Sequence, residues 1–300
     1  MRPLVKSVLI FASSFCLAWC GMLGDLSAAL QVASYDADVN ERLNGSANFI
    51  GAGYDWSGVG QTSDGRWVTM ISDEYFISVG HYHPVAGADN VRFYLSDSLS
   101  GGFEDYVVNT SFGIQLMTDQ GLSDIWIGRL TSSTSSNISS YEIFDPLPSP
   151  DILEGEDVFV VGNSGQGSYQ NFRVGTNVLD LDDGTLGVAE RSVSVVNGWS
   201  ATAIYDADVL YDTFFQSGDS GAPTFIVNNG VLELVGVHSV AGTITLPGGD
   251  EQVSIDSLVS GYRQEILGLI TPVPEPAGMV LVWGACMMLA LRRRRPVMTA

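Results

Sequence analysis

Short runs of β-branched and aromatic residues, separated by turn-forming residues, recur through most of this 300-residue chain. Eight of them are rich in Val, Ile, Phe and Tyr and end at Gly, Asp, Asn or Ser: Arg66–Ile71, Tyr75–Val79, Val91–Leu95, Ile125–Leu130, Asp157–Val161, Ala189–Val196, Thr224–Val227 and Leu232–Val237. This pattern predicts an all-β domain. Helical spacing appears only at the end, from Ile255 to Ile270, which predicts one C-terminal helix.

A polar stretch midway along the chain predicts a boundary between two β-halves. "TSSTSSN" at Thr131–Asn137 is followed by "DPLPSPDILEGE", and both sequences are typical of a surface connection.

The first 29 residues have the three parts of a secretory signal peptide. Arg2 and Lys6 precede an apolar run from Val8 to about Leu23, and Ser27-Ala28-Ala29 offers small residues for cleavage. We therefore expect signal peptidase to remove residues 1–29. The alternative is lipoprotein cleavage at Cys20, which the bulky neighbour Trp19 disfavours.

The C-terminal end also has the features of a targeting signal. An apolar stretch, Ala277–Leu291, precedes four arginines, Arg292–Arg295, which would stay on the cytoplasmic side of a membrane. The stretch is shorter than the roughly 20 residues of a full span. With Val273-Pro274-Glu275-Pro276 before it, residues 273–300 resemble the PEP-CTERM sorting signal. The resemblance implies transient membrane association and removal of the tail by an exosortase-type enzyme in a bacterium; a simple tail anchor is the alternative.

The body between these ends, residues 30–270, is strongly acidic and lacks cysteine. It contains 32 acidic and 7 basic residues, a net charge of −25, and no lysine. Nucleic-acid binding is excluded, because phosphate contacts need cations. All three cysteines, Cys16, Cys20 and Cys286, lie outside the body, so an exported domain must fold without a disulfide.

A serine within a glycine-rich turn suggests nucleophilic catalysis. "SGDSGAP" places Ser220 between Gly218 and Gly221, and glycines allow a tight turn that presents a hydroxyl beside backbone N–H groups. A nucleophilic serine needs a base and a carboxylate that orients it. His81 follows an apolar strand in "FISVGHY", and Asp124 begins another in "SDIWIGRL". His83 is the rival base.

These three blocks, in the order His, Asp, Ser, resemble those of the trypsin- or chymotrypsin-like serine proteases, and the resemblance covers about Gly58 to Ile270. It implies two antiparallel six-stranded β-barrels with a C-terminal helix, and peptide-bond hydrolysis through an acyl-enzyme. By resemblance Ser220 is the nucleophile, His81 the base and Asp124 its partner. The N–H groups of Gly218 and Ser220 would bind the oxyanion, and no cofactor is needed.

The same resemblance suggests four substrate-binding residues. Phe214 occupies the floor position of the primary pocket, where an acidic residue would select Lys or Arg. His238 and Ser217 match positions that glutamate-specific members use for an acidic side chain. Ser239 would pair its backbone with the substrate as an added strand. Phe214 and Phe215 favour an apolar pocket instead, with His238 packed behind its wall.

The sequence departs from the family in ways that leave activation open. Tyr82 replaces a common cysteine, and the Ile-Val-Gly-Gly start, whose freed ammonium pairs with the Asp before the nucleophile, is missing. A cut before Phe49 or Ile50 would free an apolar N-terminus. The sequence leaves open which group pairs with the carboxylate of Asp219. An inactive protease-like binding or structural module of the cell envelope is the alternative function.

The acidic turn "LDLDDG" is the one candidate for a metal. Asp180, Asp182 and Asp183 offer carboxylates to a structural calcium ion, but a full ligand loop is missing, and a solvated turn is the favoured interpretation.

Overall fold

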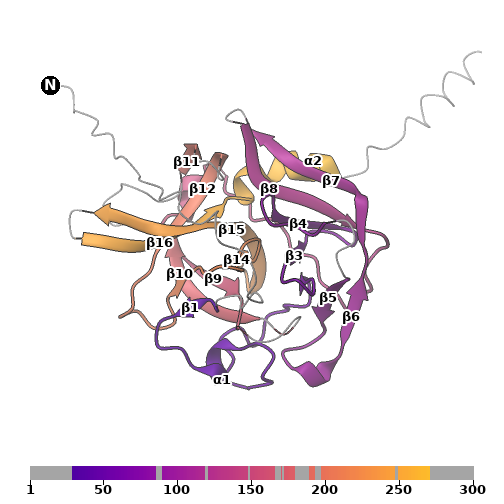
Figure 1. Cartoon of the computed structure of the whole chain (residues 1–300), viewed down its shortest axis with the longest axis horizontal. Coiled ribbons are helices and arrows are strands. Elements are labelled where there is room, and N and C mark those ends of the chain that lie inside the picture. The colour runs from indigo at the N-terminus through magenta and orange to yellow at the C-terminus, as the bar shows by residue number, and fades with distance from the viewer. Residues whose placement is uncertain are drawn as a thin grey trace, which may run out of the picture. The chain divides into compact units, whose positions relative to one another are not determined.

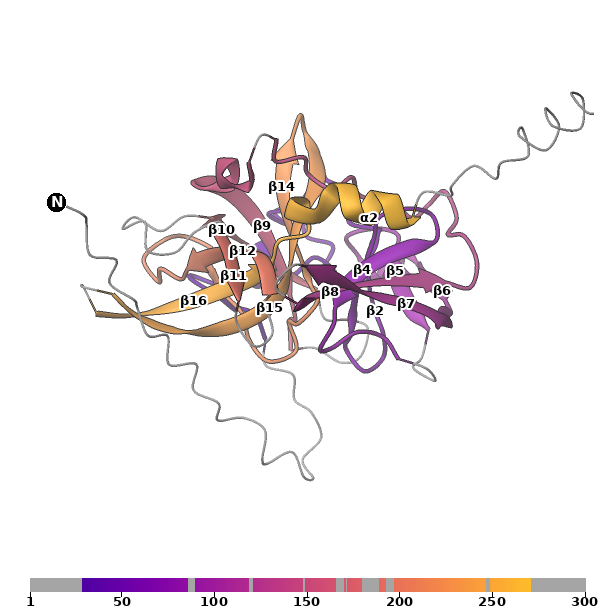
Figure 2. The same cartoon turned by 90° about the horizontal axis from the view of Figure 1, so that it is seen from above.

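The computed structural model describes residues 29–85, 90–118, 121–147, 149–165, 170, 172–179, 189–192, 197–246 and 249–270, with the backbone alone at 189–192, 197 and 246. The chain divides into two compact units, Met1–Arg263 and Gln264–Ala300. Strands dominate the first unit, and the paired strands described there are antiparallel (Figures 1 and 2).

The first large sheet, of the order β6-β5-β2-β3-β4-β8-β7, comes from the N-terminal half. Its strands are β2 (Val59–Gln61), β3 (Trp67–Met70), β4 (Tyr75–Val79), β5 (Val91–Tyr94), β6 (Phe103–Tyr106), β7 (Val108–Thr118) and β8 (Gly121–Leu130). A short 3₁₀ turn, Leu99–Gly101, joins β5 to β6. Strand β4 is almost wholly apolar because it lies between β3 and β8, and Val79 pairs with Ile125.

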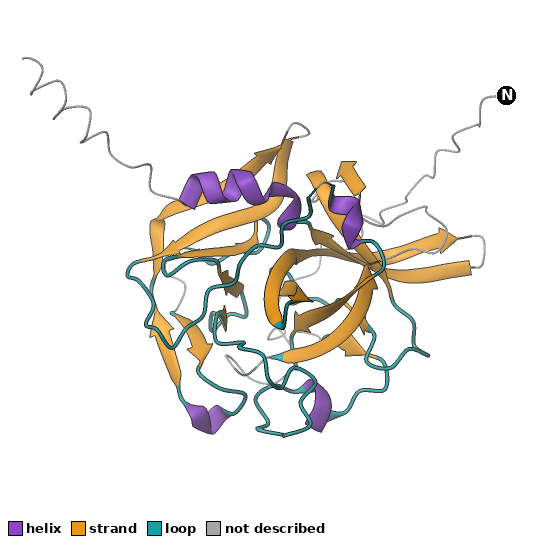
Figure 3. Ribbon diagram, turned by 180° about the vertical axis from the view of Figure 1, so that it is seen from behind, coloured by secondary structure: helices purple, strands orange, loops and turns teal. Residues whose placement is uncertain are grey.

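The second large sheet, of the order β10-β9-β14-β15-β16-β12-β11, comes from the C-terminal half. Its strands are β9 (Glu156–Gly162), β10 (Arg173–Leu179), β11 (Ala189–Ser192), β12 (Asn197–Ile204), β14 (Pro223–Asn228), β15 (Val231–Leu246) and β16 (Gly249–Ser257). A 3₁₀ turn, Pro150–Leu153, precedes β9, and another, Ser260–Tyr262, follows β16. The long strands of both sheets are curved (Figure 3).

The N-terminal segment of the described chain joins the second half through a two-stranded sheet. Strand β1 (Gln31–Val32) pairs with β13 (Thr213–Phe214), and the short helix α1 (Ala37–Asn40) follows, capped by the side chain of Asp36. A buried ion pair between Arg173 and Glu41 ties this segment to β10.

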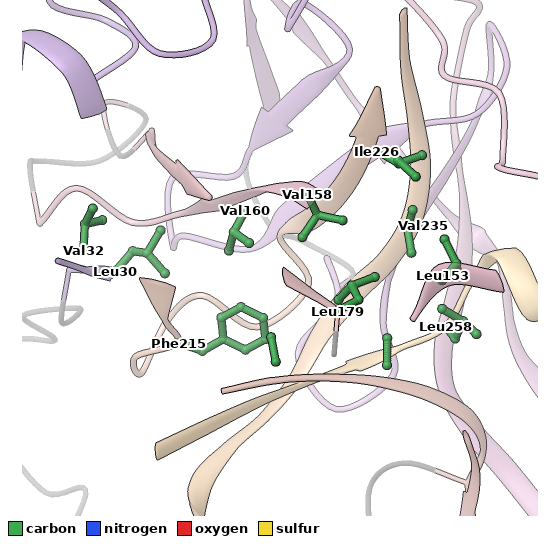
Figure 4. Close-up of a cluster of buried hydrophobic side chains, with 12 residues drawn as sticks. Leu30, Val32, Leu153, Val158, Val160, Leu179, Phe215, Ile226, Val235 and Leu258 are labelled. Carbon is green, nitrogen blue, oxygen red and sulfur yellow. The ribbon is translucent and has the colours of Figure 1, made fainter. Parts of the chain in front are cut away.

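Each large sheet has its own apolar cluster. The cluster of the first sheet includes Val68, Met70, Phe76 and Phe93. The cluster of the second brings Leu30, Val160, Leu179, Phe215 and Leu258 together from widely separated segments (Figure 4). Phe215, which lies shortly before Ser220 in the sequence, is thus part of the core of the second sheet.

The predicted all-β class is confirmed, and all eight predicted runs overlap strands, although residues 193–196 lie outside the described part. Within the described residues each large sheet has seven strands, with β6 at an edge of the first beside β5 and β11 at an edge of the second beside β12. The predicted helix begins later than its apolar spacing suggested. Ile255 belongs to β16, where it pairs with Val240 and Thr202.

Helix α2 (Arg263–Ile270) is the described part of the second unit, apart from Arg263, which belongs to the first. Within the part of the chain that the structure describes, no helix is long and apolar enough to span a membrane. Residues 1–28 of the predicted signal peptide, the predicted tail at 273–300 and the acidic turn with Asp180, Asp182 and Asp183 lie outside the described residues.

Candidate active site

Two neighbouring strands of the first sheet bring His81 and Asp124 together. His81 follows β4 and Asp124 lies within β8, and the two strands pair up to Val79 and Ile125. The Gly80 N–H donates to the Asp124 carbonyl oxygen at 3.0 Å, and the His81 N–H donates to Asp124 Oδ1 at 3.0 Å. The sheet register therefore fixes the backbone of the histidine against the carboxylate.

The imidazole of His81 links Asp124 to Ser220. Nδ1 lies 2.7 Å from Asp124 Oδ2, and Nε2 lies 2.9 Å from Ser220 Oγ. Because Nδ1 faces a carboxylate, it carries the proton, which leaves Nε2 to accept from the serine hydroxyl. Asp124 is 3% exposed in its side chain and His81 36%, so a shielded carboxylate orients a ring that solvent can reach.

Gly80 and Gln115 keep the space around this carboxylate tight. A Cβ on Gly80 would lie 2.5 Å from Gln115 Nε2 and 3.2 Å from Asp124 Oδ1, so a larger residue would push the Gln115 amide away. Gln115 in turn donates to the Ser123 carbonyl oxygen at 2.7 Å. Sequence reasoning missed Gln115, because nothing in the pattern of β7 distinguishes it.

Ser220 sits in a tight turn before β14. Gly218 and Gly221, on either side, have φ values of 98° and 86°, which glycine adopts without strain. The Asp219 N–H donates to the Gln216 carbonyl oxygen at 3.1 Å, and the Ala222 N–H donates to the Asp219 carbonyl oxygen at 2.9 Å. The glycines thus allow the turn that projects Ser220 toward His81.

The turn leaves two backbone donors beside the serine. Among the described residues, the N–H groups of Gly218 and Ser220 have no acceptor. The Gly218 carbonyl oxygen accepts from Trp67 Nε1 at 3.1 Å, which fixes the orientation of the peptide that follows. Two free N–H groups next to a serine hydroxyl are the donors that an oxyanion requires.

Asp219 holds the turn from within, and among the described residues its carboxylate accepts hydrogen bonds from backbone N–H groups. Its side chain is fully buried; Oδ1 accepts from the Asn163 N–H and Oδ2 from the Gln216 N–H, both at 2.7 Å. Burial raises the pKa of Asp219 to about 7, against these two hydrogen bonds, which lower it. The question that the sequence left open is therefore answered by backbone donors.

Asn163 connects this carboxylate to the N-terminal segment and to the first sheet. Its carbonyl oxygen accepts from the Leu30 N–H at 2.8 Å, and its Oδ1 accepts from Gln61 Nε2 at 3.1 Å. Asn163 stands directly after β9 without any motif around it, so sequence reasoning did not find it. Trp67 lies in a predicted strand, but its indole contact also could not be foreseen.

His83, the rival base, does not reach Ser220. Its ring stacks on Trp126 with centroids 3.7 Å apart, and Nδ1 lies 2.8 Å from the Gly80 carbonyl oxygen. Burial lowers the pKa of His83. The geometry favours His81 as the base.

His238 is packed rather than presented to solvent. It is 1% exposed, with Nδ1 2.7 Å from Asp256 Oδ1 and Nε2 2.6 Å from the Val161 carbonyl oxygen. Phe215 stacks on its ring at a centroid distance of 3.7 Å. As it lies here, the imidazole is not available to a substrate carboxylate, so the structure favours the packed alternative.

The other predicted substrate-binding residues come from β13, the nucleophile turn and β15. Phe214, half-buried in β13, pairs with Gln31, and Ser217 precedes Gly218 in the turn. Ser239 follows His238 at a bulge in β15, and its hydroxyl lies 2.7 Å from Ser257 Oγ. Ser239 is therefore held by β16 within β15, next to His238 and the nucleophile turn.

No family model matches the chain, and no curated protein matches it either.

Proposed function

We propose that the chain is an exported serine endopeptidase that resembles the trypsin-like family. The observation that carries the proposal is the continuous hydrogen-bonded line from Asp124 Oδ2 through His81 to Ser220 Oγ, with steps of 2.7 and 2.9 Å. Two free N–H groups beside the serine support it. A nucleophile, a base and an orienting carboxylate at hydrogen-bond distance are the elements of acyl transfer.

In this mechanism Ser220 Oγ attacks the scissile carbonyl carbon while His81 Nε2 takes the hydroxyl proton. The N–H groups of Gly218 and Ser220 donate to the oxyanion of the tetrahedral intermediate. The C–N bond breaks as His81 returns the proton to the leaving amine, which leaves an acyl-enzyme. Water then attacks the ester with the same base, and Ser220 is released. Asp124 stabilises the imidazolium without taking its proton.

We propose the two-barrel chymotrypsin-like fold for the body, residues 30–270. Its support is the division of the site: His81 and Asp124 come from the first antiparallel sheet, and Ser220 from the turn before β14 of the second. Both sheets are curved (Figure 3), as strands of a barrel are.

Processing at both ends completes the proposal. Signal peptidase removes residues 1–29, and an exosortase-type enzyme releases the segment after Pro274-Glu275-Pro276, so the mature enzyme reaches the cell envelope or the medium. The charge of −25 on the body favours solubility there.

For the primary specificity we propose an apolar side chain. Phe214 stands at the floor position of the resemblance, and His238 has both nitrogens engaged. A peptide library that varies the residue before the scissile bond tests this. Preference for Leu or Phe, unchanged by His238→Val, is expected; preference for Glu or Asp, weakened by that change, would overturn it.

The assignment of roles is tested by three variants of the exported protein. Ser220→Ala and His81→Ala should each remove measurable peptide hydrolysis, because a nucleophile or its base is lost. His83→Ala should keep kcat/KM within a few-fold of the wild type. Hydrolysis that survives Ser220→Ala in a folded protein would reject the proposed nucleophile.

A further inference from the structure

Three successive peptide groups lead to the nucleophile, and the two outer ones carry the free donors. The Gly218 N–H belongs to the first, which joins Ser217 to Gly218, and the Ser220 N–H belongs to the third, which joins Asp219 to Ser220. The middle peptide group joins Gly218 to Asp219. Because peptide groups are planar and rigid, a rotation of the middle one would turn the two donors away from a common point.

The middle peptide group is held at both of its polar atoms. The Gly218 carbonyl oxygen accepts from Trp67 Nε1 at 3.1 Å, and the Asp219 N–H donates to the Gln216 carbonyl oxygen at 3.1 Å. The bond to Gln216 lies within the turn and moves with it. Trp67 comes from β3 of the first sheet, 151 positions away in the sequence, so its bond fixes the peptide relative to the sheet that carries the proposed base.

The indole of Trp67 has little freedom to move. Trp67 is fully buried, and its ring meets that of Phe172 edge-on, with centroids 5.7 Å apart and an angle of 79° between the planes. Phe172 belongs to the second half of the chain, directly before β10. An indole carried by a strand of the first half and packed against a ring of the second presents its N–H at a fixed point.

The strand neighbour of Trp67 supports the same turn by a second route. Gln61 of β2 lies directly opposite Trp67 in the β2–β3 ladder, so the two side chains point to the same face of the sheet. Gln61 Nε2 donates to Asn163 Oδ1 at 3.1 Å, and the Asn163 N–H donates to Asp219 Oδ1 at 2.7 Å. One cross-strand pair thus holds the turn at two points, which resist its rotation better than a single point would.

We infer that Trp67 is a positioning residue whose indole N–H keeps the Gly218 and Ser220 N–H groups aimed at the oxygen of the scissile carbonyl. The inference rests on the proposed function and adds to it a residue that acts on the reaction through Gly218. Donors that are already aimed when charge develops need no reorganisation, so their orientation matters more for the transition state than for the bound substrate. The first sheet then orients the donors as well as supplying the base and its carboxylate.

The test compares Trp67 with a second buried tryptophan that makes the same kind of bond. Trp56 is 1% exposed, also packs edge-on against Phe172, and donates from Nε1 to the Gly51 carbonyl oxygen at 2.8 Å. Trp67→Phe and Trp56→Phe each remove one indole N–H and the same volume from the interior, so both should lose stability. Only Trp67→Phe removes a contact of the nucleophile turn.

The expected difference lies in kcat. Deletion of an oxyanion donor lowers kcat by about 10²–10³, so loosening both donors in Trp67→Phe should lower it about tenfold or more, with little change in KM. Trp56→Phe should leave kcat and KM close to those of the wild type. Equal falls in kcat, or a loss in Trp67→Phe that appears in KM alone, would overturn the inference.

An isosteric replacement removes the effect of a smaller ring. β-(3-Benzothienyl)alanine in place of Trp67 keeps the shape of the indole and exchanges its N–H for sulfur. We expect kcat to fall about as far as in Trp67→Phe, and the same replacement of Trp56 should not lower it. A wild-type kcat in the protein altered at position 67 would overturn the inference, whatever the phenylalanine variants do.

A peptidyl trifluoromethyl ketone reports on the oxyanion directly. Ser220 Oγ adds to the ketone carbon, its proton passes to His81 Nε2, and the carbonyl oxygen becomes an oxyanion that faces the two N–H groups. Both changes at Trp67 should weaken binding of this ketone about tenfold and leave binding of the matching peptidyl alcohol, which forms no adduct, unchanged. Ketone binding that stays at the wild-type level would reject the inference alone. A folded wild-type protein that shows neither hydrolysis nor a ketone adduct would reject the proposed function as well.

Discussion

The buried carboxylate of Asp219 holds the backbone around the nucleophile turn. Asp219 accepts from two main-chain N–H groups, so Asp219→Ala leaves both donors buried and unpaired. Each unpaired buried group costs about 1–3 kcal/mol. We expect Asp219→Ala to lower both kcat/KM and the free energy of unfolding, and Asp219→Asn, which keeps one acceptor, to lie between.

Urea unfolding together with peptide kinetics measures both quantities for the two variants. Wild-type kcat/KM in a folded Asp219→Ala protein would show that the turn keeps its shape without this carboxylate.

A second buried carboxylate, Asp212, predicts how stability changes with pH. Burial raises the pKa of Asp212 to about 6, while the unfolded chain has an ordinary aspartate. Between about pH 4 and pH 6 the folded state therefore binds more protons than the unfolded state, and stability falls as the pH rises. Asp219 acts in the same direction up to about pH 7.

The expected result is a smaller fall in the free energy of unfolding between pH 4 and pH 7 for Asp212→Asn than for the wild type. The control is Asp208→Asn, in the same loop, which removes the same charge from an exposed position. If both variants reduce the fall equally, overall charge and not the burial of Asp212 is responsible.

The three residues of the candidate site could be predicted because each stands beside an apolar run or in a turn with a local signature. His81 follows an unbroken apolar run, Asp124 begins one, and Ser220 has glycines at both sides. Asn163, Gln115 and Trp67 could not be predicted, because their roles come from long-range contacts: Asn163 lies 56 positions from Asp219. For His238 the sequence left two interpretations open, and its packing against Phe215 agrees with the packed one.

At the scale of elements, sequence patterns predicted strand existence better than strand extent. Strand β4 was predicted at its observed bounds because its residues are apolar and flanked by turn residues. The Ile255 region was predicted as helix because its apolar spacing also fits a helix, and pairing with β12 and β15 decided for a strand. The length of β15 could not be predicted, since Ala241 and Gly242 interrupt its outer half with residues that are depleted in strands.

Gly221, the glycine that follows the nucleophile, leads to a prediction when it is compared with Gly230, a glycine outside the turn. Gly221 and Gly230 both have positive φ, 86° and 83°, so alanine costs about 1–2 kcal/mol at either position. A Cβ at Gly221 would also lie 2.9 Å from Ser78 Oγ, while one at Gly230 meets nothing within 4 Å. Gly221→Ala should therefore lower kcat/KM at least tenfold, and Gly230→Ala should lower stability alone.

Thermal unfolding and peptide hydrolysis separate the two effects. Equal losses of activity in both variants would mean that backbone strain, and not the fit of the turn over Ser78, matters for catalysis.

For the whole molecule, charge is the dominant feature. The body carries a net charge of −25, and like charges repel one another more strongly in the compact state than in the expanded one. Salt reduces the range of this repulsion from about 30 Å at 0.01 M to about 3 Å at 1 M. We expect the urea midpoint to rise steadily from 0.01 M to 1 M NaCl; a constant or falling midpoint would show that repulsion is unimportant.

Processing is the second prediction for the whole molecule. The exported protein should lack residues 1–29 and the segment after Pro274-Glu275-Pro276. Intact-mass analysis measures both ends in one experiment. A mass that still includes Arg292–Arg295 would indicate that the tail is retained as a membrane anchor.

The central claim is that Ser220 is an activated nucleophile, and covalent labelling tests it most directly. A fluorophosphonate probe reacts with a serine whose base is in place, and peptide mapping locates the label. The account predicts one label, on Ser220, retained in His83→Ala and lost in both Ser220→Ala and His81→Ala. A folded wild-type protein that takes up no label, or a label on another residue, would contradict it.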